Sequence, residues 1–189
     1  ALKDFEFVAD HPKNKFTEVA VLQVARSAFA ADNYLGALAH YKRLSLIGEY
    51  KENLLEAEIG QMRCDFKLEN YTSAISHATI TLESEKINNK LENEAHLVIA
   101  KSNMMLGSDE EAITYFEMVI DKGATGQAAE AMYLKSRILF NADDLDGAET
   151  SIFNIVEDFG SESYWVAKSL ILLSDIYMTR GDLFQAKAT

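Results

Sequence analysis

The sequence of 189 residues has little cysteine, proline or glycine: one, one and nine residues. A single cysteine, Cys64, excludes an intrachain disulfide, which fits the cytosol and equally a cysteine-poor periplasmic protein. So few prolines and glycines disfavour a many-stranded β-protein, because such a fold needs frequent turns. No run of about 18 apolar residues is present, so we expect no direct membrane insertion.

Positive charge is also scarce. Eighteen lysines and arginines stand against 30 aspartates and glutamates, which gives a net charge of −12. Such a surface repels the phosphates of DNA and RNA and the headgroups of anionic lipids. We therefore expect no nucleic-acid partner, and any anion-binding site must be local.

Motifs of catalysis and cofactor binding are missing as well. The sequence has no G-x-S-x-G, H-E-x-x-H, G-x-x-x-x-G-K-[ST] or G-x-G-x-x-G string. A catalytic reading needs a nucleophile, a base and an orienting group, or a metal cluster, and none is evident. We expect no catalytic residue, no cofactor and no metal site, and we predict that the protein is not an enzyme.

What the sequence does have is an internal repeat. Polar turn-like segments are followed at a constant offset by an alanine, and we call these residues the anchors. The anchors placed in this way are Ala37, Ala74, Ala112, Ala148 and Ala186, and we add Ala1, which continues the spacing. Their spacing is 36 to 38 residues, and self-similarity at such a period is typical of helical repeat proteins.

Each repeat reads as two helices. Apolar residues recur four and seven places after most anchors, as in Tyr41 and Leu44, which is one face of a helix. A second stripe lies fifteen, twelve and eight places before each anchor, as in Leu22, Ala25 and Phe29. Ser108 with Glu111 predicts a capping box, and Asn53 with Glu56 predicts another helix start.

Two histidines occupy matching positions, since His40 and His77 each lie three residues after an anchor. Packed helices are about 8 to 10 Å apart, whereas zinc needs nitrogens at about 2.0 to 2.1 Å. No third ligand is evident in the sequence. We expect a solvated pair of surface histidines rather than a metal site.

The chain resembles the tetratricopeptide repeat (TPR) family, in a longer-period bacterial form. The resemblance rests on A-x-x-x-F/Y matches at residues 1–5, 37–41 and 112–116 and on the G-D-L-x-x-A string at 181–186. It implies an all-α fold: a right-handed α-solenoid of antiparallel helix pairs, a TPR-like superhelix. Polar residues stand where the family buries larger apolar ones, and we expect looser or rotated packing at these positions: Glu58, Gln61, Asp65 and Lys135.

We expect one TPR-like solenoid segment over residues 1–189. Its parts are a half repeat at 1–16, repeats at about 17–52, 53–90, 91–127 and 128–162, and a partial repeat at 163–189. The ends lie inside repeats and lack polar caps, so we expect a fragment of a longer array. Residues 1–20 show no signal peptide, which leaves a periplasmic or cell-envelope location and a cytoplasmic one both open.

Charged residues recur in register on the first helices. Eleven residues before successive anchors stand Arg26, Arg63, Lys101 and Arg137, followed by Asp175. Eighteen residues before the same anchors stand Val19, Glu56, Glu94, Glu130 and Lys168. Under one interpretation, a glutamate of one repeat pairs with the basic residue of the next and helps the repeats to stack. Under the other, the basic residues bind carboxylates of a partner.

We predict a non-catalytic protein–protein interaction scaffold that binds an extended peptide or a partner helix in its concave groove. The predicted peptide-binding residues are Arg26, Arg63, Lys101, Arg137, Glu94 and Glu130. Basic residues in such a groove imply an acidic protein or peptide partner. The alternative is a structural spacer or self-assembling element of a larger bacterial envelope-associated TPR protein, with end-to-end self-association.

Overall fold

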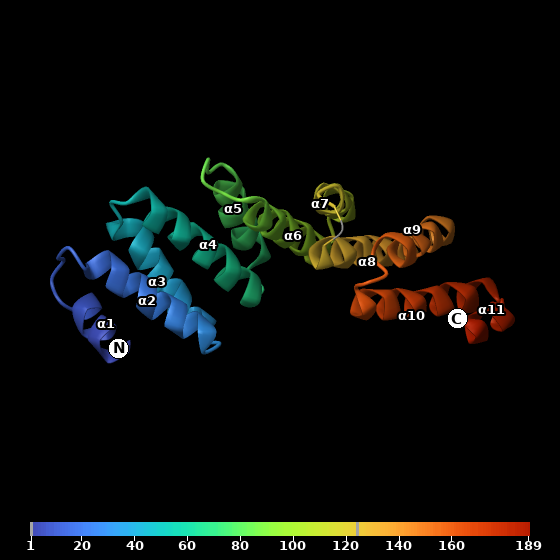
Figure 1. Ribbon diagram of the computed structural model, residues 1–189, viewed down its shortest axis with the longest axis horizontal. Coiled ribbons are helices and arrows are strands. Elements are labelled where there is room, and N and C mark those ends of the chain that lie inside the picture. The colour runs from blue at the N-terminus through green and yellow to red at the C-terminus, as the bar shows by residue number, and fades with distance from the viewer. Residues whose placement is uncertain (1, 124) are drawn as a thin grey trace. The chain divides into compact units, whose positions relative to one another are not determined.

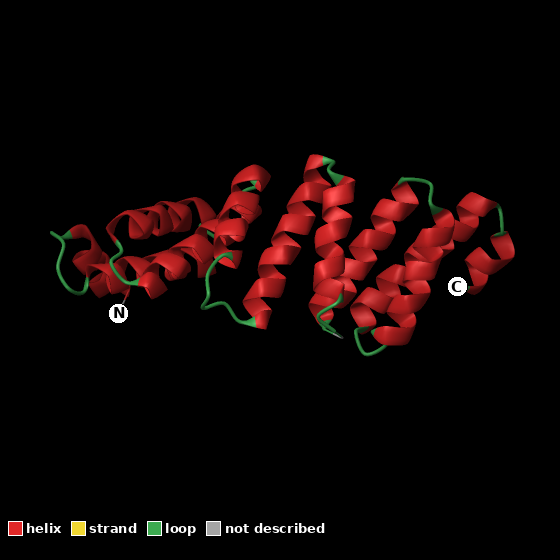
Figure 2. Ribbon diagram, turned by 90° about the horizontal axis from the view of Figure 1, so that it is seen from above, coloured by secondary structure: helices red, strands yellow, loops and turns green. Residues whose placement is uncertain are grey.

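A computed structural model describes residues 2–123 and 125–189 of the protein, and Ala1, the first predicted anchor, lies outside this part. Every regular element within it is an α-helix, as Figures 1 and 2 show. The predicted all-α fold is therefore confirmed. We call α2, α4, α6, α8 and α10 first helices, and α3, α5, α7, α9 and α11 second helices, after their order within each predicted repeat.

The contacts of the chain divide it into two compact units, and the first ends at Ser102. Its helices are α1 (Leu2–Asp10), α2 (Thr17–Ala30), α3 (Tyr34–Ile47), α4 (Lys51–Lys67), α5 (Tyr71–Leu82) and the larger part of α6 (Asn89–Leu106). Within it α3 packs on both α2 and α4, and these two first helices also contact each other. The second helix α3 thus covers the seam between the successive first helices α2 and α4.

The second unit begins at Asn103. Its further helices are α7 (Asp109–Ile120), α8 (Gly126–Asn141), α9 (Leu145–Asp158), α10 (Ser163–Arg180) and α11 (Leu183–Ala188). Here α9 packs on α8 and α10, and the first helices α8 and α10 contact each other. The packing order of the first unit is thus repeated.

The anchors lie in the core. All the described anchors are buried, four of them completely and Ala186 nearly so. The residues four and seven places further on are buried too in the first four of these repeats, among them Leu44 and Ile152. An alanine at the crossing lets the two helices of a repeat approach closely. Truncating a fully buried isoleucine such as Ile152 to alanine costs about 2 to 5 kcal/mol, so this stripe stabilises the stack.

The turn between the two helices of a repeat has the same backbone geometry each time. The residue five places before each described anchor has a positive φ of 56° to 79°: Asp32, Glu69, Gly107, Asp143 and Gly181. The next residue donates its N–H to the carbonyl of the residue five positions earlier, for example Asn33 to Ala28 at 3.0 Å. This is a Schellman motif, which satisfies the last carbonyls of the first helix.

The helix caps differ in part from the prediction. Ser108 is the N-cap of α7, but its side chain makes no capping hydrogen bond, so the predicted capping box does not form. The helix start predicted at Asn53 is wrong, because α4 begins at Lys51. Asn53 instead donates to the buried carboxylate of Glu18 at 2.8 Å. Satisfying a buried charge on the preceding first helix outweighs the local capping preference.

Candidate functional site

Two of the predicted peptide-binding residues form ion pairs between neighbouring first helices. Arg26 on α2 donates from Nη2 to Glu56 Oε2 on α4 at 2.7 Å. Arg63 on α4 donates from Nε and Nη2 to the two carboxylate oxygens of Glu94 on α6, at 2.5 and 2.7 Å. Each arginine thus bonds to the glutamate of the following repeat, which reverses the predicted direction of pairing. The residue eleven positions before one anchor thus lies opposite the residue eighteen positions before the next anchor.

These ion pairs occupy side chains that were predicted to bind a partner peptide. Hydrogen bonding to Glu94 holds the pKa of the Arg63 guanidinium above its ordinary value, although burial acts in the opposite sense. A bidentate pair of this kind fixes the orientation of both side chains. In the first unit the basic row therefore joins successive repeats.

Two further predicted residues, Lys101 and Glu130, are also engaged. Lys101 Nζ on α6 lies 5.4 Å from the centroid of the Phe66 ring on α4, a cation–π distance. Lys101 and Glu130 on α8 each have an interaction partner. Neither residue presents a charge that only a partner molecule would satisfy.

Arg137 on α8 is different. It is exposed, and within residues 2–123 and 125–189 it forms no ion pair or side-chain hydrogen bond. The position in the following repeat that holds glutamate opposite Arg26 and Arg63 holds Lys168, on α10. Lys168 likewise has no carboxylate partner among the described residues. Two unmatched cations thus occur on neighbouring first helices, in a protein whose net charge is −12.

Three aromatic rings surround the Lys168 amine. Its Nζ lies 5.4 Å from the ring centroid of Tyr133, 5.3 Å from that of Tyr164 and 5.8 Å from that of Trp165. Trp165 also packs beside the core residues Met132 and Phe159. The indole therefore packs between repeats, while the Tyr164 side chain is exposed. Cation–π contacts hold the amine at this surface without neutralising it.

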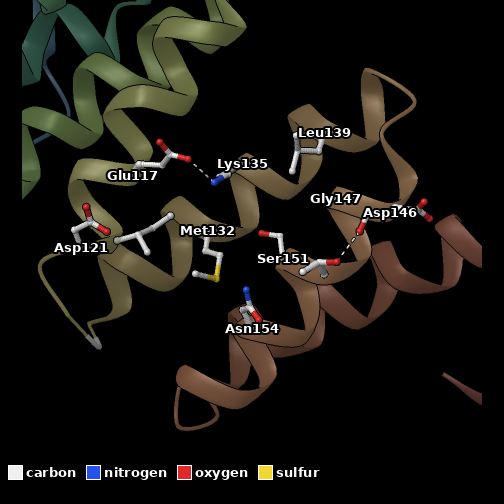
Figure 3. Close-up of a pocket in the computed structure, with 11 residues that line it drawn as sticks. Glu117, Asp121, Met132, Lys135, Leu139, Asp146, Gly147, Ser151 and Asn154 are labelled. Carbon is white, nitrogen blue, oxygen red and sulfur yellow. Dashed lines mark hydrogen bonds and ion pairs between the residues drawn. The ribbon is translucent and has the colours of Figure 1, made fainter.

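A groove of about 690 Å³ lies among α7, α8 and α9 of the second unit. Its floor includes Met132, Lys135 and Leu139 of α8, and Figure 3 shows Lys135 reaching towards Glu117 of α7. Lys135 Nζ donates to Glu117 Oε1 at 2.6 Å. The wall contributed by α9 consists of short side chains: Asp146, Gly147, Thr150, Ser151 and Asn154.

Solved structures are similar to this chain in fold. The crystal structure of YrrB, described as a TPR protein with an unusual peptide-binding site, has a TM-score of 0.69 and 16% sequence identity, over 98% of this chain and 88% of that one. The crystal structure of the MamA protein has a TM-score of 0.71 and 14% identity, over 93% of this chain and 88% of that one. No family model and no curated protein matches the sequence.

The chain has the tetratricopeptide-repeat fold. The resemblance proposed from the anchor alanines is confirmed at the level of the fold, as is the all-α solenoid class.

Within this TPR framework, Lys135 is an exception to a regular pattern. The residues thirteen places before the other described anchors are uncharged and buried: Val24, Gln61, Ile99 and Leu173. Only the Lys135 side chain remains 26% exposed, with its amine on Glu117. The groove lies at this residue, which agrees with the looser packing expected there. Gln61 and Asp65, for which the same was expected, are instead buried.

Asp65 belongs to a polar cluster between α4 and α5 of the first TPR unit. His77 Nδ1 lies 2.6 Å from Glu58 Oε2, and His77 Nε2 lies 3.7 Å from Asp65 Oδ2. Asn70 donates to the other Asp65 oxygen at 3.1 Å. The prediction of two solvated histidines is therefore wrong for His77, which is half-buried between carboxylates. Within the described ranges no group of three or more His, Cys, Asp or Glu side chains is placed to hold a metal ion.

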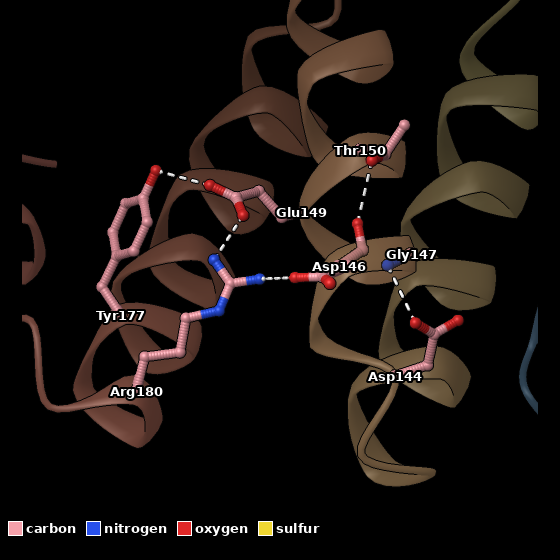
Figure 4. Close-up of polar contacts among 7 residues, drawn as sticks. All are labelled: Asp144, Asp146, Gly147, Glu149, Thr150, Tyr177 and Arg180. Carbon is pink, nitrogen blue, oxygen red and sulfur yellow. Dashed lines mark hydrogen bonds and ion pairs between the residues drawn. The ribbon is translucent and has the colours of Figure 1, made fainter.

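A second polar cluster fastens the TPR helices α9 and α10 together. Figure 4 shows the Arg180 guanidinium between the carboxylates of Glu149 and Asp146, and Tyr177 pointing at the same Glu149. Arg180 donates to both carboxylates, and Tyr177 Oη donates to Glu149 at 2.8 Å. The pKa of Glu149 is lowered, first by its hydrogen bond from Arg180 and further by that from Tyr177.

The last helices expose apolar side chains. Ile171 and Met178 belong to the predicted first-helix stripe, yet they are 66% and 57% exposed on α10. Leu183 and Phe184 on α11 are exposed as well. None of the helices within residues 2–123 and 125–189 is long and apolar enough to cross a membrane.

Sequence reasoning missed two of these residues as candidates. Lys168 was visible only as a lysine in a row of glutamates, and its significance depends on the ring contacts and on the cross-repeat pairing. Lys135 was noticed as a polar residue at a position that is usually apolar, but the groove beside it follows from the short side chains of α9. The sequence carried a signal for both lysines: each has a charge that differs from the residues at the same distance from most other anchors.

Proposed function

We propose that the protein is a non-catalytic interaction scaffold that binds an extended acidic peptide along the first helices α8 and α10. The observation behind this proposal is the pair of cations, Arg137 and Lys168, which have no carboxylate among the described residues. Elsewhere in the same register, Arg26 and Arg63 do have one. A partner's carboxylates would complete the row of charge pairs where the chain itself does not.

The neighbouring rings give such a peptide a second kind of contact. Tyr164 is exposed beside Lys168, and Tyr133 lies one helical turn from Arg137 on the same side of α8. An acidic peptide with apolar or aromatic residues between its carboxylates fits this surface. Of the residues first predicted to bind a peptide, the proposed site therefore keeps only Arg137, and it adds Lys168 and the aromatic rings. In this proposal Arg26, Arg63 and Glu94 help the repeats to stack, while Lys101 and Glu130 remain with their own partners.

The test is fluorescence anisotropy with a labelled peptide of alternating glutamate and leucine, beside the same peptide with glutamine for glutamate. Binding of the glutamate peptide should weaken at least about tenfold in the variant Arg137→Glu/Lys168→Glu, because two attractions become repulsions. The control is Lys3→Glu/Lys42→Glu, which makes the same charge change at exposed residues of α1 and α3. Equal affinity in all three proteins, with circular dichroism showing equal helix content, would reject the proposal.

A structural role through self-association is the second candidate, and one observation favours it. Ile171, Met178 and Phe184 expose apolar surface together on the last two helices. Two copies that cover this surface would form a dimer, which sedimentation velocity would detect as a concentration-dependent increase in mass. Ile171→Glu/Met178→Glu should abolish that increase, and a monomer at all concentrations excludes this role for the segment.

A further inference from the structure

The groove among α7, α8 and α9 is flanked by helices that contain acids and no base. The acids of α7 are Asp109, Glu110, Glu111 and Glu117. Those of α9 are Asp146, Glu149, Glu157 and Asp158. Basic side chains reach these helices from their neighbours: Lys135 contacts Glu117, and Arg180 contacts Asp146 and Glu149. Acids therefore remain in excess on both sides of the groove.

The floor of the groove is apolar around the Lys135 amine. Met132 and Leu139 of α8 lie one turn before and one turn after Lys135, and Ile120 closes the α7 side. On the α9 side Gly147, Thr150 and Ser151 are too short to fill the space. An apolar side chain from outside gains contact with this floor that no residue lining the groove supplies.

We propose that this groove binds a basic amphipathic helix of a partner protein. Apolar side chains at helical spacing on the partner pack on Met132 and Leu139, and its lysines or arginines pair with Glu117 and Asp121. The proposal goes beyond the function proposed above, because the walls of this groove are the second helices α7 and α9 and the partner has the opposite charge.

The position of Asp121 adds to the attraction for a cation. Asp121 is the C-cap of α7, it is exposed, and it has no ion pair among the residues that the structure describes. The C-terminal end of a helix favours positive charge by its dipole. A partner's basic side chain there meets a carboxylate and the end of the α7 dipole together.

The probe is a fluorescein-labelled synthetic helix of leucine and lysine in the amphipathic register, titrated with the whole chain in an anisotropy assay. Two comparison peptides separate the contributions: one with the same composition but a scrambled register, and one with glutamate for lysine. We expect the amphipathic lysine peptide to bind at least about tenfold more tightly than either, since it alone satisfies both floor and rim.

Three variants locate the site. Asn154→Trp places a large ring on the α9 wall and should weaken binding at least about tenfold, while Glu117→Gln/Asp121→Asn should weaken it about fivefold. The matched control Glu157→Gln/Asp158→Asn changes the net charge equally at exposed residues of α9 that do not line the groove, and it should leave the affinity within about twofold. Thermal unfolding followed by circular dichroism checks that each variant is folded.

Each outcome of these binding measurements either supports the groove or overturns it. A loss of affinity confined to Asn154→Trp and Glu117→Gln/Asp121→Asn supports the groove. An equal loss in Glu157→Gln/Asp158→Asn, or equal binding of the scrambled peptide, overturns it in favour of general attraction to an acidic protein. The variant Arg137→Glu/Lys168→Glu should keep its affinity for the basic helix, so that failure of the acidic-peptide site and failure of this one are separate results.

Discussion

Arg63 of α4 donates two hydrogen bonds to the carboxylate of Glu94 on α6 and so joins two successive repeats through one bidentate ion pair. The side chains are 42% and 28% exposed, so water screens part of their attraction. The pair is therefore a stacking device of modest strength. Its contribution is measurable as a coupling between the two residues.

A double-mutant cycle tests this pair. Arg63→Gln and Glu94→Gln should each lower the free energy of unfolding by about 1 kcal/mol, and the double variant should lose less than the sum of the two. Urea denaturation followed by circular dichroism gives these values. Arg137→Gln is the control, because Arg137 has no such partner among the described residues, and it should leave stability unchanged. Strictly additive losses would show that the two side chains are not coupled.

The Arg180 cluster predicts a dependence of stability on acid. The pKa of Glu149 is lowered in the folded protein below its ordinary value of 4.5, mainly by hydrogen bonding to Arg180. Stability from this group is therefore fully present above pH 4.5 and is lost as the pH falls through the folded pKa. Glu149→Gln should flatten this part of the melting-temperature profile between pH 5 and pH 3, whereas Asp158→Asn should not. An unchanged acid limb in Glu149→Gln contradicts the assignment.

Glu69 has a positive φ of 62° in the turn after α4, where a side chain with a Cβ is unfavourable. Glycine adopts this conformation without that cost but gains entropy in the unfolded chain. Glu69→Gly should therefore stabilise the protein by about 0.5 kcal/mol net. Gly181→Ala, at the matching position after α10, should destabilise it by about 1 kcal/mol. Destabilisation by both changes would show that factors other than backbone strain decide the turn.

Burial raises the pKa of the Cys64 thiol from 9.0 to about 12. The thiolate is the reactive form, so the native protein at pH 8 should react with Ellman's reagent about a thousandfold more slowly than after unfolding in urea. Introducing an exposed cysteine by Ser161→Cys supplies a positive control in the same chain. Fast labelling of native Cys64 would mean that α4 opens readily at this residue.

The fold was predictable because the period of the sequence agrees with the packing of the helices. The anchor alanines mark where two helices cross, so their spacing located the second helices, and the stripes around them located the core. The exceptions occur at the last described repeat, where Ile171 and Met178 have the predicted spacing but are exposed. Spacing identifies the side of the helix that is apolar, and only the neighbouring helices decide whether that side is covered.

The interaction surfaces were less predictable, because charge pairs depend on how far one helix is shifted along the next. The sequence showed the basic and acidic rows, but not that Arg26 would meet Glu56 and Arg63 would meet Glu94. Asn53 illustrates the same limit, since its side chain serves the buried Glu18 of another helix and not its own helix start. Register between helices is a property of the whole packed stack.

The repeated turn has a consequence for engineering. Its geometry is defined by backbone torsion and by a main-chain hydrogen bond, as in the 2.9 Å bond from the Asp144 N–H to the Leu139 carbonyl. Aspartate, glutamate and glycine all occupy its left-handed position. The joint between two helices is thus largely independent of side-chain identity. Repeats exchanged at this joint should therefore keep their hinge angle, which makes it the natural splice site for chimaeric arrays and for attaching reporter groups.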